Sequence, residues 1–460
     1  MFGGGLGTVA AMADLDAIFK AYDVRGIYPD QIDADVARRT GAAFAAFMQR
    51  EDPALTTVVV GNDMRPSGVE LVAAFNDGVT SQGIDVVALG LASTDMLYYA
   101  AGVLNVPGAV FTASHNPAQY NGIKMCRAGA APIGAESGLL DIKQLVIDGV
   151  EPAATTGTVT ERDMLADFAA HVHSFIDPGN LRPLKIVADT ANGMGGLVVP
   201  AVFDTLPVEL EILYPELDGT FPNHPADPIN MENLKDLRAR VLETGADIGL
   251  AFDGDADRVF LVDELAQPIS GSLTTAIVAS GMLDKHDDAT VIYNLICSKV
   301  VPEVVTAKGG TAVRSRVGHS FIKQLMAETG AIFGGEHSGH YYFKDNFRAD
   351  SGLIAALVIL EQLSLAGTTM SELCAPFRRY AASGEINTTV DDQQAVIEKV
   401  AAHFADAEQD HLDGMTVDFG TWWFNLRASN TEPLLRLNLE APTEADVEAR
   451  VAEVQAVMGS

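Results

Sequence analysis

The sequence predicts an α/β fold of four domains: three related α/β domains with mixed sheets, and a smaller α+β domain at the C-terminus. Three observations predict it. The chain has 460 residues, which is more than one ordinary domain holds. Strand-like runs alternate with helical periodicity, as is typical of α/β proteins. One pattern recurs three times and then gives way to a different C-terminal segment.

Each copy of the pattern begins with a β-branched strand, continues through a helix to a second strand, and reaches a short third strand followed by a polar loop. Phe111, Phe252 and Phe333 take the same place at the ends of the third strands. Ligands gather beyond the carboxyl ends of parallel strands, so we expect three chemically different loops around one central cleft. The first strands are expected at 57–63, 185–193 and 290–294, the second at 83–90, 208–214 and 310–316, and the third at 108–117, 246–258 and 330–340.

The C-terminal segment follows another pattern, with a helix at 393–406, strands within 415–441 and an amphipathic helix at 444–458. We expect residues 1–14 to form a disordered extension, because they have neither the basic nor the apolar region of a signal peptide. The four domains are then predicted at residues 15–157, 158–263, 264–383 and 384–460.

Composition restricts the partners. Hydrophobic residues make up 48% and charged residues 20%, as in a globular protein with an ample core. The apolar run 353–360 is far shorter than the roughly 18 residues that span a bilayer, so it predicts a buried helix and no membrane partner. The net charge of −32 argues against nucleic acid as a partner. Cys126, Cys297 and Cys374 have no metal-binding spacing and suit a reducing cytoplasm.

Asp253, Asp255 and Asp257 alternate in a loop after an expected strand, which brings three carboxylates to one side. Such a cluster repels itself unless a cation lies within it, and oxygen ligands favour Mg²⁺ or Ca²⁺. An EF-hand is excluded, because Arg258 stands where that loop needs glycine and strand-like 259–262 follows. We expect a metal with an open position for a substrate or serine oxygen, and a phosphoryl group beside Arg258.

Ser114 follows an expected strand in a loop stiffened by Asn116 and Pro117, which predicts an exposed hydroxyl. A serine hydroxyl alone is a weak nucleophile, but a divalent cation would stabilise its oxygen or a phosphate on it. The neighbouring His115 suggests a protease-like pair. Adjacent side chains in an extended loop point to opposite sides, however, and the G-x-S-x-G pattern of hydrolases is absent.

Two later loops suit a phosphorylated sugar. In the run 335–340, Glu336, Ser338 and two imidazoles can exchange hydrogen bonds with sugar hydroxyls, and glycines allow close approach. The run 427–433 combines an arginine with hydroxyl, amide and turn N–H groups, which together make a phosphate cradle. Its candidate residues are Arg427, Ser429, Asn430 and Thr431.

The motifs TASHNP, DGDADR, GEHSGH and RASNTEP, with YDVRG near the N-terminus, resemble those of the α-D-phosphohexomutase family in the same order and along the whole chain. The GEHSGH form is most similar to the bacterial phosphomannomutase and phosphomannomutase/phosphoglucomutase group. The resemblance implies a Mg²⁺-dependent isomerase that converts hexose 1-phosphates and 6-phosphates through a phosphoserine and a hexose 1,6-bisphosphate. It favours mannose phosphates and a supply of mannose 1-phosphate for GDP-mannose synthesis, with glucose or dual specificity as the alternative. The implied enzyme is a cytoplasmic monomer or homodimer.

The resemblance also implies roles for individual residues. Ser114 would carry the phosphoryl group and complete the metal shell of Asp253, Asp255 and Asp257, while Lys124 and His319 would transfer protons. Glu336 and Ser338 would hold sugar hydroxyls, and Arg427, Ser429, Asn430 and Thr431 the non-reacting phosphate. Further active-site positions match Tyr22, Arg25, Lys124, Arg258, His319 and His340. Some relatives have a lysine where Ile296 stands here, and Lys299 lies nearby.

Two other functions share these features. A metal-dependent phosphatase would use the same serine and metal but would release phosphate to water. A non-catalytic carbohydrate-binding protein would leave Ser114 without a purpose. Mannose and glucose differ only at C2, and none of the candidate residues is expected to distinguish that carbon.

Overall fold

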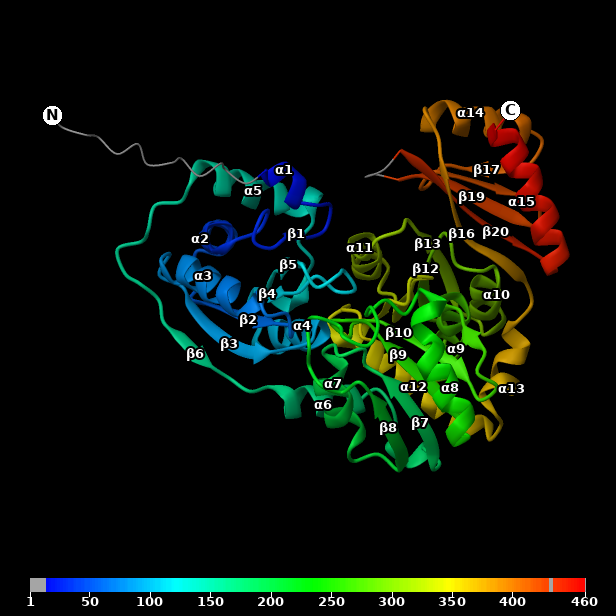
Figure 1. Cartoon of the computed structure of the whole chain (residues 1–460), viewed down its shortest axis with the longest axis horizontal. Coiled ribbons are helices and arrows are strands. Elements are labelled where there is room, and N and C mark those ends of the chain that lie inside the picture. The colour runs from blue at the N-terminus through cyan, green and yellow to red at the C-terminus, as the bar shows by residue number, and fades with distance from the viewer. Residues whose placement is uncertain (1–13, 430–432, 460) are drawn as a thin grey trace. The chain divides into compact units, whose positions relative to one another are not determined.

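The computed structural model describes residues 14–429 and 433–459, so nearly all of the predicted extension at 1–14 lies outside the described residues. The chain divides into two bodies (Figure 1). The first contains the chain through Leu165 together with Asn192–Met194 and Glu216–Ala226. The second contains Ala166–Ala191, Gly195–Pro215 and the chain from Asp227 onward.

The first body is built on a six-stranded mixed sheet in the order β1-β5-β4-β2-β3-β6. Strands β2, β3, β4 and β6 are parallel, while β5 is antiparallel to both β1 and β4. The last strand joins the sheet beyond residue 157, and the domain limits remain our predictions. The strands are β1 (Val24–Ile27), β2 (Thr57–Asn62), β3 (Asp85–Leu91), β4 (Gly108–Phe111), β5 (Tyr120–Cys126) and β6 (Val159–Glu161).

Helices cover both faces of this sheet. The connections β2–α3–β3 and β3–α4–β4 run in opposite directions along the sheet, so right-handed crossovers place α3 and α4 on opposite faces. Polar side chains cap the N-termini of two helices: Asp33 accepts from the Val36 N–H in α2, and Ser93 accepts from the Met96 N–H in α4. The helices are α1 (Leu15–Ile18), α2 (Ala34–Glu51), α3 (Gly68–Thr80), α4 (Thr94–Leu104), α5 (Leu139–Asp148), η1 (Ala128–Ala130) and η2 (Ala135–Ser137).

The second body repeats the same sheet twice. The strands run β8-β7-β9-β10 in one sheet, which β11 extends, and β13-β12-β14-β15 in the other. Both match β3-β2-β4-β5 of the first body, so the predicted threefold repeat and mixed sheets are confirmed. The strands are β7 (Leu184–Asp189), β8 (Val208–Leu213), β9 (Ile248–Phe252), β10 (Val259–Asp263), β11 (Pro268–Ile269), β12 (Thr290–Asn294), β13 (Thr311–Ser315), β14 (Phe333–Gly335) and β15 (Tyr341–Phe343).

Helices connect the first three strands of each of these two repeats, as the periodicity predicts. The helices of the two repeats are α6 (Leu165–His173), η3 (Pro178–Asn180), α7 (Gly195–Phe203), η4 (Met231–Leu234), α8 (Lys235–Thr244), α9 (Gly271–Leu283), α10 (Val300–Ala307), α11 (His319–Thr329), η5 (Lys344–Asn346), α12 (Gly352–Ala366), α13 (Met370–Cys374) and η6 (Ala375–Phe377).

The position predicted for Phe333, at the end of its strand, is wrong. Phe111 and Phe252 end their strands, but Phe333 begins β14. The strand continues through Gly334 and Gly335, where the surroundings leave no room for a side chain. A Cβ at Gly334 would lie 2.8 Å from Ile322, and one at Gly335 would lie 2.4 Å from Thr275. The polar loop therefore begins at Glu336.

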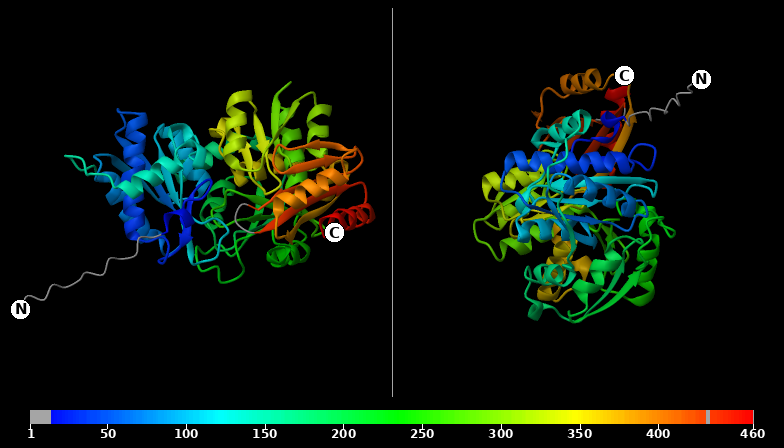
Figure 2. Two further views of the ribbon diagram at one scale, coloured as in Figure 1. Left: turned by 90° about the horizontal axis from the view of Figure 1, so that it is seen from above. Right: turned by 90° about the vertical axis from the view of Figure 1, so that its left-hand side faces the viewer.

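The C-terminal domain is an antiparallel five-stranded sheet in the order β16-β20-β19-β18-β17, as expected for α+β. Helices α14 and α15 contact each other and lie on the same face of the sheet (Figure 2). Strand β16 crosses the limit predicted between residues 383 and 384, and this limit stays a prediction. The elements are β16 (Ala381–Thr389), α14 (Gln393–His403), β17 (Glu408–Asp410), β18 (Met415–Asp418), β19 (Trp423–Ala428), β20 (Leu434–Ala441) and α15 (Glu444–Gly459).

The apolar run 353–360 is a buried helix, as predicted: it forms most of α12, and every residue from Gly352 to Glu361 is buried. Among the described residues, no single helix has both the length and the apolar composition to cross a membrane. The only combination that reaches the required length there is α12 with Met370–Phe377, and a bend of 99° separates the two. Cys126, Cys297 and Cys374 are all buried thiols.

Helices α2 and α3 approach so closely that two glycines form the contact. A Cβ at Gly41 would lie 2.2 Å from the Phe75 carbonyl oxygen, and one at Gly78 would lie 2.0 Å from the Arg38 carbonyl oxygen. Both obstacles are backbone atoms, which cannot move aside as the end of a side chain can. The two helices would have to separate to admit a methyl group.

Gly78→Ala should therefore destabilise the first body. We expect a loss of about 2 kcal/mol, which corresponds to a fall in melting temperature of about 4–8 °C. Differential scanning calorimetry measures it. Gly459→Ala is the control, because a Cβ there meets nothing within 4 Å. An unchanged melting temperature for Gly78→Ala would contradict the close helix contact.

Candidate functional site

Each of the four candidate loops connects two strands that pair antiparallel in a sheet. The serine loop (residues 112–119) joins β4 to β5, and the aspartate loop (253–258) joins β9 to β10. The glutamate loop (336–340) joins β14 to β15, and the C-terminal loop (429–433) joins β19 to β20. Both ends of each loop are thus fixed by strand pairing, and loops on a rigid scaffold are where functional residues concentrate.

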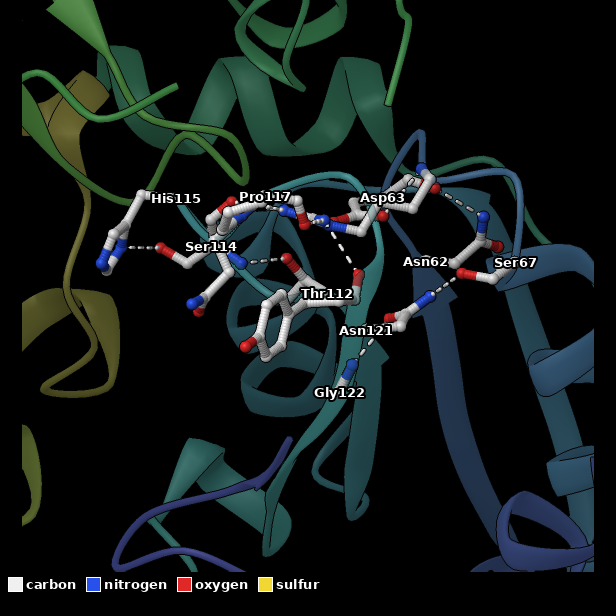
Figure 3. A network of polar contacts seen from close by, with 12 residues as sticks. Asn62, Asp63, Ser67, Thr112, Ser114, His115, Pro117, Asn121 and Gly122 are labelled. Carbon is white, nitrogen blue, oxygen red and sulfur yellow. Dashed lines mark hydrogen bonds and ion pairs between the residues drawn. The ribbon is translucent and has the colours of Figure 1, made fainter. Parts of the chain in front are cut away.

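Ser114 lies in a tight turn after β4 (Figure 3). Its φ of 48° is in the left-handed region, which non-glycine residues seldom adopt. Its N–H donates to Thr112 Oγ1 at 2.9 Å, and the Asn116 N–H donates to the Ala113 carbonyl at 2.9 Å. The Ser114 hydroxyl lies 3.2 Å from Nδ1 of His115. Such local strain is characteristic of functional sites.

Two expectations about this serine are wrong. The side chains of Ser114 and His115 lie on the same side rather than on opposite sides, because the positive φ of Ser114 breaks the extended geometry that the expectation assumed. The hydroxyl was also expected to be exposed, yet Ser114 is only 5% exposed.

A buried arginine holds the serine loop from beneath. Arg65 is 1% exposed, and its Nε donates to Oδ2 of the fully buried Asp63 at 3.2 Å. Its other guanidinium N–H groups donate at 2.7–3.0 Å to four backbone carbonyls, those of Ser114, Asn116, Pro117 and Tyr120. A guanidinium has five N–H groups, and all five are used here.

The other predicted residues of the first body lie in strands β1 and β5 or just before β1. Arg25, in β1, donates from one nitrogen to Asn116 Oδ1 at 2.7 Å and from another to Asp23. Lys124, in β5, is paired in register with Val110 of β4 and is partly exposed. Tyr22 lies in the bend before β1. The sheet therefore brings Arg25 into direct contact with the serine loop.

The aspartate loop buries three carboxylates together. Asp253, Asp255 and Asp257 are each at most 1% exposed, and one oxygen from each lies within 4.8 Å of the others. Arg258 donates from Nε to Asp253 Oδ2 at 2.8 Å and is 2% exposed. Burial by itself lowers the pKa of Arg258, but the negative charges of Asp253 and Asp257 outweigh it and raise this pKa above its ordinary value. Strand β10 follows the loop, which confirms that it is no EF-hand.

Three buried carboxylates this close together repel one another, and burying them away from water is costly. All-oxygen donors at this spacing suit a hard divalent cation. The described residues of the aspartate loop therefore fit a metal ion.

The glutamate loop adjoins the aspartate loop within the second body. Arg258 and His340 form an isolated β-bridge, and His340 Nε2 lies 3.9 Å from Asp257 Oδ1. Potential ligand atoms of Asp257, His340 and Asp350 also lie within 4.8 Å of one another, and Asp350 forms a buried ion pair with Lys323 at 3.1 Å. The structure thus brings two of the predicted loops together.

Glu336 is buried and held from three directions. It accepts from the Tyr342 hydroxyl at 2.6 Å, from Asn294 Nδ2 at 3.1 Å and from the Gly318 N–H at 3.4 Å. Burial, followed by the charge of Glu336, raises the pKa of Tyr342 well above its ordinary value, so the tyrosine stays a donor. A carboxylate offers about four acceptor positions, which leaves capacity for a ligand hydroxyl.

Two further predicted residues belong to the same region of the second body. Ser338 lies 3.1 Å from His340, between the hydroxyl oxygen and Nδ1. His319 is the first residue of α11 and follows Gly318, whose N–H contacts Glu336. His319 and Glu336 are therefore brought to the same end of this sheet.

The C-terminal loop is described in part. Arg427 lies near the end of β19 with 15% of its side chain exposed, and it pairs weakly with Asp413 at 3.5 Å and Glu385 at 4.0 Å. Ser429 is buried and donates its N–H to the Leu434 carbonyl at 2.9 Å. Predicted residues Asn430 and Thr431 lie outside the described residues.

Lys299, considered in place of the lysine that some relatives carry at Ile296, has a different partner. Its amino group donates to Asp418 Oδ1 at 2.6 Å and to the Gly420 carbonyl at 2.9 Å. It therefore ties α10 to the C-terminal sheet, and these contacts assign it no part in the candidate loops.

Arg65, Tyr342 and Asp413 hold candidate residues in place and were not predicted from the sequence. Only Arg65 had a signal: it follows a buried strand in the run 61-GNDMRPSG-68, where an aspartate and an arginine stand two residues apart. Tyr342 donates to Glu336, six residues before it, across the β14–β15 turn, and Asp413 lies 14 residues before Arg427. No motif in the sequence marks either contact.

Four family models match successive parts of the chain. Three carry the description phosphoglucomutase/phosphomannomutase, alpha/beta/alpha domain: domain I matches residues 16–147, domain II residues 166–266 and domain III residues 270–380. The C-terminal domain of the same family matches residues 385–457.

Whole-length relatives agree with the family models. The chain is 39% identical over 455 residues to a phosphomannomutase of Salmonella montevideo, with 96% of this chain and 99% of the relative covered. A protein of Xanthomonas campestris pv. campestris named phosphohexose mutases is 39% identical over 445 residues, covering 95% and 98%. A solved structure of a phosphoglucomutase/phosphomannomutase family protein from Burkholderia thailandensis has a TM-score of 0.88 at 34% identity, covering 96% of each chain.

Adding a divalent cation should stabilise the protein. A cation at 100 times its dissociation constant contributes about 2.7 kcal/mol, which raises the melting temperature measured by differential scanning fluorimetry. Asp255→Asn should raise the melting temperature without cation, because it removes like-charge repulsion, and should abolish the rise with cation. The control, Asp287→Asn, changes an exposed carboxylate of the same body. A full cation-dependent rise in Asp255→Asn would contradict the aspartate site.

Proposed function

Because the chain belongs to the phosphoglucomutase/phosphomannomutase family, we propose that it is a phosphomannomutase, which interconverts mannose 1-phosphate and mannose 6-phosphate. The observation that carries the proposal is the 39% identity to a phosphomannomutase across 96% of this chain. A cytoplasmic location and a monomeric or homodimeric state belong to the same proposal.

The reaction proposed for Ser114 is a reversible phosphoryl transfer. Phosphorylated Ser114 gives its phosphoryl group to the 6-hydroxyl of mannose 1-phosphate, whose proton passes to a base, and mannose 1,6-bisphosphate forms. The bisphosphate reorients, and Ser114 takes the phosphoryl group from C1, which leaves mannose 6-phosphate. Because Ser114 is covered in this structure, its hydroxyl must become accessible during each transfer. Lys124 and His319 are the proposed proton carriers.

Electrostatics would supply most of the rate enhancement. We propose that Mg²⁺ is the cation held by Asp253, Asp255 and Asp257, with the Ser114 phosphoryl oxygen as a further ligand. When bound, it would neutralise negative charge on the transferring phosphoryl group. Arg258, held by Asp253 at 2.8 Å, and Arg25, held by Asn116 at 2.7 Å, present fixed positive charges for the same group.

Substrate recognition is proposed for the other two loops. Glu336, oriented by Tyr342, accepts from a sugar hydroxyl, while Ser338 and His340 bind its neighbours. Tyr22 is proposed to contact the substrate as well. The non-reacting phosphate binds in the C-terminal loop, to Arg427, Ser429, Asn430 and Thr431.

Two alternatives remain in the proposal. The first is specificity for glucose phosphates or for both sugars. It stays open because mannose and glucose differ only in the configuration at C2, and none of the candidate residues is expected to distinguish that carbon. A k_cat/K_M comparison on mannose, glucose and glucosamine 1-phosphates decides among the substrates. A phosphatase would instead release free phosphate, which a phosphate assay on the same samples detects.

Ser114→Ala should lower mutase activity by at least about 10³-fold, because the alanine has no oxygen to carry the phosphoryl group. A coupled assay with mannose 1-phosphate and a trace of bisphosphate measures the isomerised product. Ser81→Ala, in the same body, is the control. Near-normal turnover by Ser114→Ala would exclude this serine as the phosphoryl carrier.

Arg427→Ala should raise K_M by about 10–100-fold with a smaller change in k_cat, because one charged hydrogen-bonding group to the non-reacting phosphate is worth about 1.5–3 kcal/mol. Steady-state kinetics on mannose 1-phosphate measure the effect. The control is Arg450→Ala, which removes an arginine of α15 that pairs with Glu453. Arg427 does not bind phosphate if its K_M is unchanged.

A further inference from the structure

We propose that Arg65 is a positioning residue for phosphoryl transfer at Ser114: it fixes the backbone turn that aims the serine hydroxyl. This inference rests on the proposed function, because it assigns a role in the same reaction. Nothing about Arg65 suggests contact with substrate, since it is 1% exposed and its guanidinium is occupied by protein acceptors.

The guanidinium of Arg65 contacts Ser114 and the residues that follow it. One terminal nitrogen donates to the carbonyls of Ser114 at 3.0 Å and Asn116 at 2.7 Å, and the other to those of Pro117 at 2.8 Å and Tyr120 at 2.9 Å. A single planar group therefore fixes three points of the serine loop and the first residue of β5, and one of these points is the carbonyl of Ser114 itself.

The guanidinium is in turn fixed by its surroundings. Asp63 accepts from its Nε at 3.2 Å and from the Arg65 backbone N–H at 2.9 Å, which sets the plane of the group. The Phe221 ring lies over the guanidinium, with 5.1 Å from Cζ to the ring centre. Gly219 approaches so closely that a Cβ there would lie 2.6 Å from the Arg65 Cα. Arg65 thus has little freedom to move, and neither has the loop above it.

This arrangement explains how Ser114 keeps an unfavourable conformation. A φ of 48° persists in a non-glycine residue only where the surroundings over-determine it. Removing the hold on the Ser114 carbonyl lets the peptide relax and turns the hydroxyl away from its present direction. Phosphoryl transfer depends on alignment of the attacking and leaving oxygens, so a small reorientation lowers the rate of the chemical step.

Arg65→Lys tests the proposal with the charge preserved. An ammonium has three N–H groups in a compact tetrahedral head and cannot reach four carbonyls and Asp63 at once. We expect k_cat to fall about 10²-fold while K_M for mannose 1-phosphate stays within about threefold, because misalignment affects the transfer and leaves the sugar and phosphate loops intact. Hydrogen–deuterium exchange of the amides of residues 112–122 should become about tenfold faster or more.

Arg127→Lys is the matched control in the same body. The Arg127 guanidinium also donates from all three of its nitrogens, to Glu51 at 2.7 and 2.8 Å and to the Pro132 carbonyl at 3.2 Å, and none of these bonds reaches the serine loop. We expect its k_cat, K_M and loop exchange to match the wild type.

The outcomes separate the inference from the proposed function. A k_cat within threefold of wild type in Arg65→Lys overturns the positioning role, as does equal loss of activity in both lysine variants. If the wild-type protein shows no mutase activity, the proposed function fails, and the exchange measurement still decides whether Arg65 holds the loop. Unchanged exchange in Arg65→Lys overturns that hold.

Discussion

Antiparallel strand pairing on either side of each loop is the constraint on which the rest of this structure depends. In all three mixed sheets the third strand runs parallel to the central strand and turns straight back into an antiparallel fourth strand. A parallel connection would need a long crossover, whereas this one needs only a short loop. The loops that carry Ser114, the three aspartates and Glu336 are therefore short, and both of their ends are fixed by backbone hydrogen bonds. The same holds between β19 and β20 of the C-terminal sheet.

Buried charge at and beside those short loops is compensated in two different ways. Asp63 and Arg65 balance each other, and the excess donors of the guanidinium are used on backbone carbonyls, so this pair is complete within the protein. The aspartate loop buries three carboxylates beside Arg258, which suits a bound cation. The first arrangement gives rigidity, and the second gives a candidate binding site. The first follows β2, the first strand of its repeat, and the second follows β9, the third strand of the next repeat.

Much of the fold and one of the candidate loops were predictable from the sequence. The fold class, the threefold strand pattern and the C-terminal α+β domain follow from hydrophobic periodicity, which burial imposes directly on the chain. The aspartate cluster was also recognisable, because three alternating acidic residues after a strand are hard to explain without a cation. The single error in the repeat came from aligning phenylalanines, whereas steric room at Gly334 and Gly335 decides where β14 ends.

The orientation of side chains in the loops was less predictable. The rule of alternating sides fails at Ser114, because one backbone angle in the left-handed region redirects the next side chain. The residues that hold the candidate residues in place were not predicted for a different reason. Arg65 reaches residues about fifty positions away, and Asp413 contacts both Arg427 and the Val317 backbone. Contacts of this kind are decided by tertiary packing, so local sequence patterns carry little trace of them.

The short segment Glu216–Ala226 has a consequence for how the protein is made. It belongs to the first body, where Gly219 and Phe221 lie against Arg65. All six strands of the first sheet precede this segment in the sequence, because the last of them, β6, ends at Glu161. During synthesis on the ribosome, the strands on either side of the serine loop emerge well before this segment does. The N-terminal part of the nascent chain must therefore wait for residues of the second repeat before its buried arginine is shielded from water.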